Sequence, residues 1–203
     1  MPNEFVGYPK IARLAREMIV TEKLDGTNAQ IFITFDPADV QDKHPGIYPA
    51  AIALSEVGHM YIFTGSRNRW ITPHDDNFGF AKWVAENASE LSKLGPGRHF
   101  GEWYGRGIQR GYGLDERRFA LFNTSRWNDD LTRPRCCSVV PVVMTGVFDT
   151  ALIDRCVDDL RHNGSFAVPG YMDPEGVVVF HVASGALFKK TLKDDESPKT
   201  ATK

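Results

Sequence analysis

Short segments of alternating or continuous apolar residues predict strands along most of the chain. Two segments rich in β-branched and aromatic residues, about 17 to 23 and about 28 to 35, come first. Residues 36 to 58 contain prolines and scattered charges, so we expect a long excursion there with little regular structure. Further strands are expected near residues 59 to 64, 98 to 104, 118 to 123, 139 to 147, 176 to 182 and 186 to 192.

Apolar residues at spacings of three and four predict two helices. The first follows Thr72-Pro73, carries Phe80, Val84, Ala88 and Leu91, and ends at Gly95-Pro96. The second runs from about 150 to 162, with Asn163-Gly164 after it and an apolar face of Leu152, Ile153, Cys156, Val157 and Leu160. Strands in runs with few helices predict an α+β fold of mostly antiparallel sheets with flanking helices.

The length fits one domain. A chain of 203 residues with 42% hydrophobic residues can bury one sizeable core but is short for two full domains. We therefore expect a single domain over residues 1–193. The tail 194–203 has Ala201 as its only apolar residue, and we expect it to be mobile.

Composition limits the compartment and the partners. No apolar run has the length of a signal peptide or of a membrane span, which predicts a cytoplasmic protein that does not bind membranes. Three cysteines, two of them adjacent, make no disulfide framework, and no Cys-x-x-Cys pair indicates zinc. The formal net charge of −2 gives no global signature of a nucleic-acid-binding protein, so such binding must use local patches.

Lys23-Leu24-Asp25-Gly26 joins the first two predicted strands and places an amine and an acid at the rim of a sheet. In isolation this is best interpreted as a charged surface hairpin, because Asp-Gly is a common hairpin dipeptide. Polar motifs at later strand ends change that interpretation. In chain order they are Ser66-Arg67, Gly101-Glu102-Trp103-Tyr104-Gly105, Phe119-Ala120-Leu121-Phe122-Asn123, Glu175-Gly176-Val177-Val178-Val179 and Phe188-Lys189-Lys190-Thr191.

In this order, and over nearly the full length, the motifs resemble the covalent nucleotidyltransferase superfamily of ATP-dependent ligases and capping enzymes. Within it the chain is most similar to ATP-dependent RNA ligases of the RNA-repair type, which seal nicks in duplex RNA. Asn28 supports this distinction, since DNA ligases and capping enzymes usually have arginine there, and so does Tyr8-Pro9-Lys10-Ile11. The resemblance runs from about Phe5 to Glu196 and implies the ligase adenylation fold (ATP-grasp-like).

The chemistry of such an enzyme suits these residues. A lysine amine attacks the α-phosphate of ATP only when neutral, and nearby cations favour that form; Arg67, Lys189, Lys190 and a bound metal are candidates. Phosphoryl transfer also needs charge neutralisation on the phosphate oxygens. Mg²⁺ or Mn²⁺, held by one or two carboxylates, meets this need, and we assign Glu175 to the metal with help from Asp25.

The resemblance assigns the remaining roles. Glu22 and Asn28 bind the nucleotide beside Lys23, Glu102 accepts hydrogen bonds from the ribose, and Arg67 contacts the sugar or a phosphate. Phe122 stacks on adenine, although it is alternatively a core residue, with Phe119 as the competing ring. For Glu102 the alternative is a surface charge beside Arg98 or Arg106. Gly101 and Gly105, which flank it, suggest close backbone approach to another group.

Two features depart from the family pattern. Its last motif usually has two lysines separated by one residue, whereas Lys189 and Lys190 are adjacent here. We take Lys189 as the phosphate contact and expect Lys190 to point to the other side of the strand, with Lys193 or Lys10 as a replacement charge. The chain also stops soon after the last motif, so we expect a bare catalytic domain without the family's usual C-terminal domain, monomeric or helped by an accessory protein.

Basic residues with nearby aromatic rings are candidates for RNA binding. They are Arg106, Arg110, Arg117 and Arg118, then Arg126, Arg133 and Arg135, with Tyr112 and Trp127 for stacking. A solvated charged face explains them equally well. The sequence thus predicts an ATP-dependent RNA ligase that joins 5′-phosphate and 3′-hydroxyl ends through lysyl-AMP at Lys23. A DNA nick ligase of the same fold and a nucleotide- or RNA-binding module that has lost sealing remain the alternatives.

Overall fold

A computed structural model describes residues 4–193 and residue 195, and its contacts group the chain into two compact units. Unit 1 comprises Met1–Lys23 and Pro141–Lys203, and unit 2 comprises Leu24–Val140. That residues 1–193 form a single catalytic domain stays a prediction. Each unit is described below by itself. Apart from residue 195, the predicted mobile tail lies outside the described residues.

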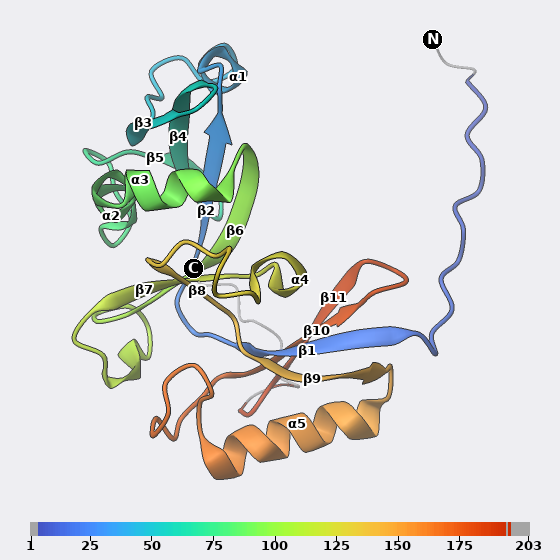
Figure 1. Cartoon of the computed structure of the whole chain (residues 1–203). Coiled ribbons are helices and arrows are strands. Elements are labelled where there is room, and N and C mark those ends of the chain that lie inside the picture. The colour runs from blue at the N-terminus through green and yellow to red at the C-terminus, as the bar shows by residue number, and fades with distance from the viewer. Residues whose placement is uncertain (1–3, 194, 196–203) are drawn as a thin grey trace, which may run out of the picture. The chain divides into compact units, whose positions relative to one another are not determined.

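Unit 1 is a four-stranded antiparallel sheet with one long helix. Its strands are β1 (Glu17–Lys23), β9 (Val142–Val147), β10 (Gly176–His181) and β11 (Ala186–Thr191). They lie in the order β11-β10-β1-β9, and α5 (Thr150–Asn163) runs along one face of the sheet (Figure 1). These elements confirm the strands and the helix predicted for the two ends of the chain.

The helix α5 begins and ends where its sequence provides caps. The Asp149 carboxylate accepts a hydrogen bond from the backbone N–H of Ala151 at 2.8 Å, which satisfies a donor of the first turn. Gly164 follows the last turn with φ +80°, a conformation that glycine adopts without strain. The apolar face of the helix packs on the sheet in one core cluster, formed by Met18, Val20, Ile153, Cys156, Val157, Leu160, Val177 and Val179.

Unit 2 is built on a seven-stranded sheet. Its path is β3 (Ala51–Ser55), β4 (Gly58–Ser66), β2 (Thr27–Thr34), β6 (Gly97–Gly105), β7 (Arg117–Leu121) and β8 (Cys137–Val139), and β5 (Trp70–Ile71) pairs with β4. All pairs are antiparallel except β7 with β8. The short helices are α1 (Ala38–Gln41), α2 (Phe80–Glu86), α3 (Ala88–Leu91), α4 (Thr124–Trp127), η1 (Ser92–Leu94) and η2 (Gly111–Gly113). The predicted α+β class, with mostly antiparallel sheets, is confirmed.

Three local expectations need correction. The excursion over residues 36 to 58 contains α1 and the edge strand β3, so it is more regular than its prolines indicate. The helix predicted as continuous up to Gly95 breaks at Asn87, whose side-chain amide donates to the Trp83 carbonyl at 2.8 Å and competes with the helical ladder. The strand expected near 139 to 147 is divided into β8 and β9.

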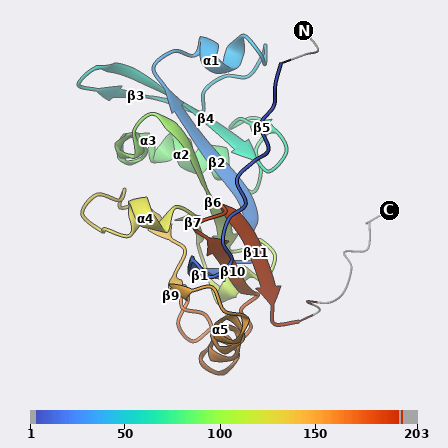
Figure 2. The same cartoon turned by 90° about the vertical axis from the view of Figure 1, so that its right-hand side faces the viewer.

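The unit 2 sheet has a covered face and an open face. The covered face carries residues such as Ile31, Ile62 and Phe119, which form one core with Phe80, Ala81 and Val84 of α2 and with Leu91 of α3; Figure 2 shows these helices beside the sheet. Because strand residues alternate between faces, the neighbouring positions in β2 and β6 belong to the open face. Asn28 and Glu102, which are direct cross-strand partners, lie there. No helix in the described part of the chain has the length and apolar character needed to cross a membrane.

Candidate active site

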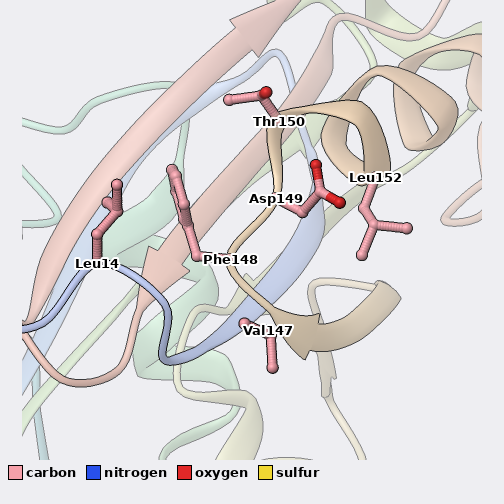
Figure 3. Close-up of a pocket in the computed structure, with 6 residues that line it drawn as sticks. All are labelled: Leu14, Val147, Phe148, Asp149, Thr150 and Leu152. Carbon is pink, nitrogen blue, oxygen red and sulfur yellow. The ribbon is translucent and has the colours of Figure 1, made fainter.

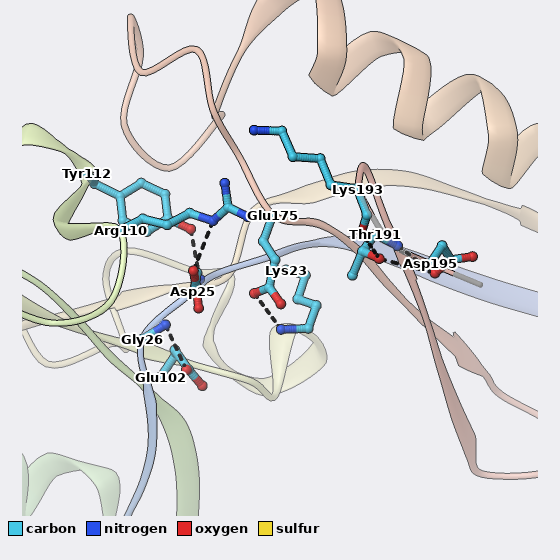
Figure 4. A network of polar contacts seen from close by, with 10 residues as sticks. All are labelled: Lys23, Asp25, Gly26, Glu102, Arg110, Tyr112, Glu175, Thr191, Lys193 and Asp195. Atoms are coloured by element: carbon cyan, nitrogen blue, oxygen red, sulfur yellow. Dashed lines mark hydrogen bonds and ion pairs between the residues drawn. The ribbon is translucent and has the colours of Figure 1, made fainter. Parts of the chain in front are cut away.

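Lys23 ends β1 and forms an ion pair within unit 1. Its Nζ lies 2.5 Å from Oε2 of Glu175 (Figure 4). Glu175 immediately precedes β10, whose first residue, Gly176, is the cross-strand partner of Lys23. Strand pairing therefore brings together two predicted site residues that are 152 positions apart in the sequence. Both side chains are partly exposed, so the pair can exchange partners with a ligand.

Glu22 faces the opposite way from Lys23. Its side chain is 1% exposed, and its Oε2 accepts hydrogen bonds from the backbone N–H groups of Phe166 at 2.8 Å and Ala167 at 2.9 Å. Oε1 is buried without a hydrogen-bond partner among the described residues. Burial raises the pKa of the Glu22 carboxyl above its ordinary value, against the opposing effect of Ser165 and of the two amides. The carboxylate thus ties the end of β1 to the loop after α5.

The adjacent lysines of β11 lie on different faces of the unit 1 sheet. Lys189 pairs with Val178, which pairs with Thr21 of β1, so Lys189 shares the face of Lys23. Lys190 lies on the α5 side, where its Nζ contacts Asp154 at 2.5 Å. The replacement lysines considered above also have clear locations. Lys193 pairs with Asp173 at 2.8 Å, and Lys10 is exposed in the segment before β1.

Asp25 and Gly26 are held within unit 2 by groups far along the chain. Arg110 Nε donates to Asp25 Oδ2 at 2.9 Å, and the Tyr112 hydroxyl accepts from the Asp25 backbone N–H at 2.8 Å (Figure 4). The backbone N–H of Gly26 donates to Glu102 Oε1 at 3.1 Å. A Cβ on Gly26 would lie 2.4 Å from the Trp103 carbonyl oxygen, so only glycine fits there. No motif spacing indicated that Arg110 and Tyr112 support this turn.

Glu102 is placed by a close strand contact. A Cβ on Gly101 would lie 2.4 Å from the Ala120 carbonyl oxygen, so the close approach inferred from the flanking glycines is at least in part to the protein's own neighbouring strand. The structure also places Glu102 against Gly26 and opposite Asn28. Arg67 lies exposed in the turn between β4 and β5.

The two candidate stacking rings differ in exposure. Phe119 is fully buried, and its ring lies 5.0 Å from that of Phe80. Phe122, directly after β7, is 38% exposed, and its backbone N–H donates to the Phe100 carbonyl at 3.0 Å. Phe119 is therefore a core residue, and Phe122 is the ring that a base can reach.

The predicted basic RNA-binding cluster is wrong in its aromatic part. Tyr112 and Trp127 are buried in the core and present no ring face to a base. Several of the arginines support loops. Arg117 donates to the carbonyls of Arg106 and Phe78, and Arg133 donates to those of Cys137 and Trp127.

The carboxylates near the predicted site suit a hard cation that keeps most of its ligands as water or phosphate oxygens. Among the described residues no group of three His, Cys, Asp or Glu side chains could hold a metal ion. Glu175 in unit 1 and Asp25 in unit 2 each offer carboxylate oxygens, and each is already paired with a cation. Taken singly, either carboxylate suits a Mg²⁺ or Mn²⁺ ion whose other ligands are water and phosphate oxygens.

A pocket of about 440 Å³ in unit 1 contains none of the predicted site residues (Figure 3). It is lined by Leu14, Val147, Phe148, Asp149, Thr150 and Leu152. Its one carboxylate, on Asp149, caps α5. We assign no ligand to this pocket.

Comparison with known proteins decides the family. The family model described as RNA ligase matches residues 16–191. The chain belongs to the RNA ligase family. The match includes every predicted site residue of this RNA ligase chain, from Glu22 to Lys190. No curated protein matches it.

Solved RNA ligases from Naegleria gruberi share the fold. A mutant solved with ATP and Mn has a TM-score of 0.54 at 16% identity, covering 92% of this chain and 53% of its own. A second mutant with AMP and Mn has a TM-score of 0.53 at 17% identity, covering 88% of this chain and 50% of its own. A third, with ATP and Mn, has a TM-score of 0.51 at 17% identity. The RNA ligase chain described here thus spans about half the length of these structures.

Proposed function

We propose that this RNA ligase chain is an ATP-dependent enzyme that joins RNA 5′-phosphate and 3′-hydroxyl ends through a covalent AMP adduct on Lys23. The observation that supports this most is the Lys23–Glu175 ion pair at the end of β1. It holds an amine at the position of the family's nucleophile, although 152 residues separate the partners. A protein that only binds nucleotides has no need of a nucleophile there.

Three transfers follow from this assignment. In the first, Lys23 Nζ forms a bond to the α-phosphorus of ATP, the bond to pyrophosphate breaks, and the amine proton leaves. In the second, an oxygen of the RNA 5′-phosphate attacks the same phosphorus and releases Lys23. In the third, the 3′-hydroxyl attacks the 5′-phosphate of this activated end, and AMP leaves as the phosphodiester forms.

Cations near Lys23 favour its neutral, attacking form. Lys189 shares the sheet face of Lys23, so we assign it to the phosphate and to this electrostatic role. Lys190 is held by Asp154 on the α5 side, and its role is to support the strand. Glu175 and Asp25 would hold Mg²⁺ or Mn²⁺, which when bound neutralises charge on the phosphate oxygens. Two Naegleria gruberi structures solved with ATP and Mn are consistent with this assignment.

The nucleotide contacts are assigned by residue. Glu102 accepts hydrogen bonds from the ribose hydroxyls, Phe122 stacks on adenine, and Arg67 contacts the sugar or a phosphate. Glu22 has its carboxylate buried, so any contact it makes with the nucleotide uses backbone atoms. Asn28, opposite Glu102 in β2, addresses the adenylate or the incoming strand end.

The substrate proposed is a nick or a structured end of RNA, joined in the cytoplasm by a monomer or with an accessory protein. A direct test compares sealing of nicks with all-RNA, all-DNA and mixed termini, with ATP and Mg²⁺. The proposal predicts preference for nicks whose 3′-hydroxyl strand ends in ribonucleotides, where the 2′-hydroxyl offers a recognition group. Equal or better sealing of all-DNA nicks would instead assign a DNA nick ligase, and no sealing of a preadenylated strand would assign a binding module.

A further inference from the structure

The open face of the unit 2 sheet bears a group of aromatic and cationic side chains beyond Glu102, of which Arg98 and Phe100 are exposed and Phe32 and Trp70 are partly buried. Arg98, Phe100 and Glu102 occupy alternate positions of β6 and therefore lie on one face, about 6.8 Å apart in succession. Phe32 of β2 is the direct cross-strand partner of Arg98. Trp70 of β5 pairs with Gly65, which pairs with Gln30 on the same face. We call Phe32, Trp70, Arg98 and Phe100 the open-face patch.

The guanidinium of Arg98 lies over two of these rings. Its Cζ lies 4.7 Å from the centroid of Phe32 and 5.4 Å from that of Trp70. Arg98 Nη1 donates to Gln30 Oε1 at 2.7 Å, which anchors the group on the sheet. The arginine side chain has five N–H donors, and the bond to Gln30 uses one of them. A stacked guanidinium presents both a flat surface and a positive charge, a combination that suits a base and its phosphate.

Phe100 extends the patch toward the proposed nucleotide site. Its side chain is 46% exposed and lies between Arg98 and Glu102 on the same strand face. The backbone of Phe122, the proposed adenine-stacking residue, is hydrogen-bonded to Phe100. The patch is thus continuous with the ribose and adenine positions assigned above.

We propose that the open-face patch binds unpaired bases of an RNA strand, which stack on Phe100 and on the Arg98 layer next to the adenylate. This inference rests on the proposed function, because it names how the same site holds its RNA. Exposed aromatic side chains on a sheet face are a common means of binding single-stranded RNA. Bases inside a duplex keep their faces covered by their neighbours, so the patch selects the unpaired segment of a structured RNA end over the paired bases at a nick.

The experiment measures binding of a fluorescent single-stranded RNA, a blunt RNA duplex of the same sequence and a single-stranded DNA, without ATP. Phe100→Ala should weaken binding of the single strand about 5- to 100-fold, whereas Phe100→Tyr should restore it. Val57→Ala removes an exposed apolar residue of the same sheet, in the β3–β4 turn, and should leave binding unchanged. Arg98→Ala should reduce the slope of binding against salt by about one.

Tryptophan fluorescence locates the bound strand. Trp103 and Trp127 are buried, and Trp83 packs in the core, so quenching by RNA should come from Trp70 and disappear in Trp70→Phe. Four results would each overturn the proposal. They are wild-type affinity in Phe100→Ala, a loss of affinity in Val57→Ala as large as that in Phe100→Ala, binding of the blunt duplex as tight as that of the single strand, and quenching that persists in Trp70→Phe. No binding of the single strand by wild type would also overturn the proposal.

Failure of this proposal can be told apart from failure of the proposed function. Lysyl-AMP formation needs no RNA, and Phe100→Ala should form the adduct within about 2-fold of wild type. Adduct formation together with unchanged RNA affinity in the variants would reject the patch and leave the ligase assignment intact. RNA binding by the patch without any adduct in wild type would reject the ligase assignment alone.

Discussion

Replacing Glu22 tests how the strand that ends in Lys23 is held. Glu22→Ala removes the acceptor of two partly buried backbone N–H groups, those of Phe166 and Ala167. A fully buried donor left without a partner costs about 1–3 kcal/mol, and water reaches these two in part, so about 6 kcal/mol is the upper bound for the loss in the free energy of unfolding of unit 1. Glu22→Gln keeps the shape and an acceptor oxygen, and it should lose less than Glu22→Ala.

The pH dependence of the Gln variant separates charge from shape. The unfolded-state pKa of Glu22 is about 4.5, and burial raises its folded-state pKa above that value. Between the two pKa values the folded chain therefore binds more protons than the unfolded chain. The contribution of Glu22 to stability is therefore fully present below pH 4.5 and is lost as the pH rises through the raised pKa. Glutamine does not titrate, so the free energy of unfolding of Glu22→Gln should rise relative to that of wild type as the pH increases from 4.5 through the raised pKa.

The assay must report on unit 1. All four tryptophans lie in unit 2, so their fluorescence follows the other unit. Hydrogen exchange of the Phe166 and Ala167 amides, with urea unfolding followed by circular dichroism from pH 4.5 to 8, measures unit 1 directly. Unchanged protection of both amides in Glu22→Ala at pH 7, or a difference between wild type and Glu22→Gln that does not vary with pH, would refute this reasoning.

Four further substitutions test individual assignments. Lys189→Ala should lower formation of the Lys23–AMP adduct about 10-fold or more, whereas Lys190→Ala, which breaks a half-exposed surface pair, should change it less than about 2-fold. Labelling with α-labelled ATP on a denaturing gel measures both variants, and the reverse order would exchange the roles of the two lysines. Glu175→Ala should abolish metal-dependent adduct formation, and wild-type labelling would remove Glu175 from the metal. Asn28→Ala should still form the adduct but seal nicks poorly, and loss of both steps together would place Asn28 in the first step.

The sequence predicted the strands and helices better than the positions where they begin and end. The strands β1, β2, β10 and β11 and the helix α5 follow from apolar patterns that tertiary packing also satisfies. The edge strand β3 was missed because prolines dominate its surroundings, and the break at Asn87 depends on a side-chain hydrogen bond that periodicity does not record. Both errors occur where a local interaction outweighs the secondary structure that composition or periodicity favours.

For the site, the sequence named the chemical groups but not their supports. Strand register explains why Lys189 and Lys190 separate onto two faces, because alternation is regular within a strand. The contacts of Asp25 with Arg110 and Tyr112 join positions more than 80 residues apart, which no spacing rule connects. The buried Trp127 and Tyr112 show the same limit, since aromatic residues beside arginines suit a core as well as an RNA surface.

The central claim is that Lys23 becomes covalently bound to AMP. Incubation of the protein with ATP labelled at the α-phosphate and with Mg²⁺, followed by a denaturing gel, measures this adduct without any RNA. A labelled band is expected in wild type and none in Lys23→Ala or Lys23→Arg, because arginine keeps its charge and does not attack. Retention of the label in either folded variant would remove Lys23 as the nucleophile, and its absence from folded wild type would reject the covalent mechanism.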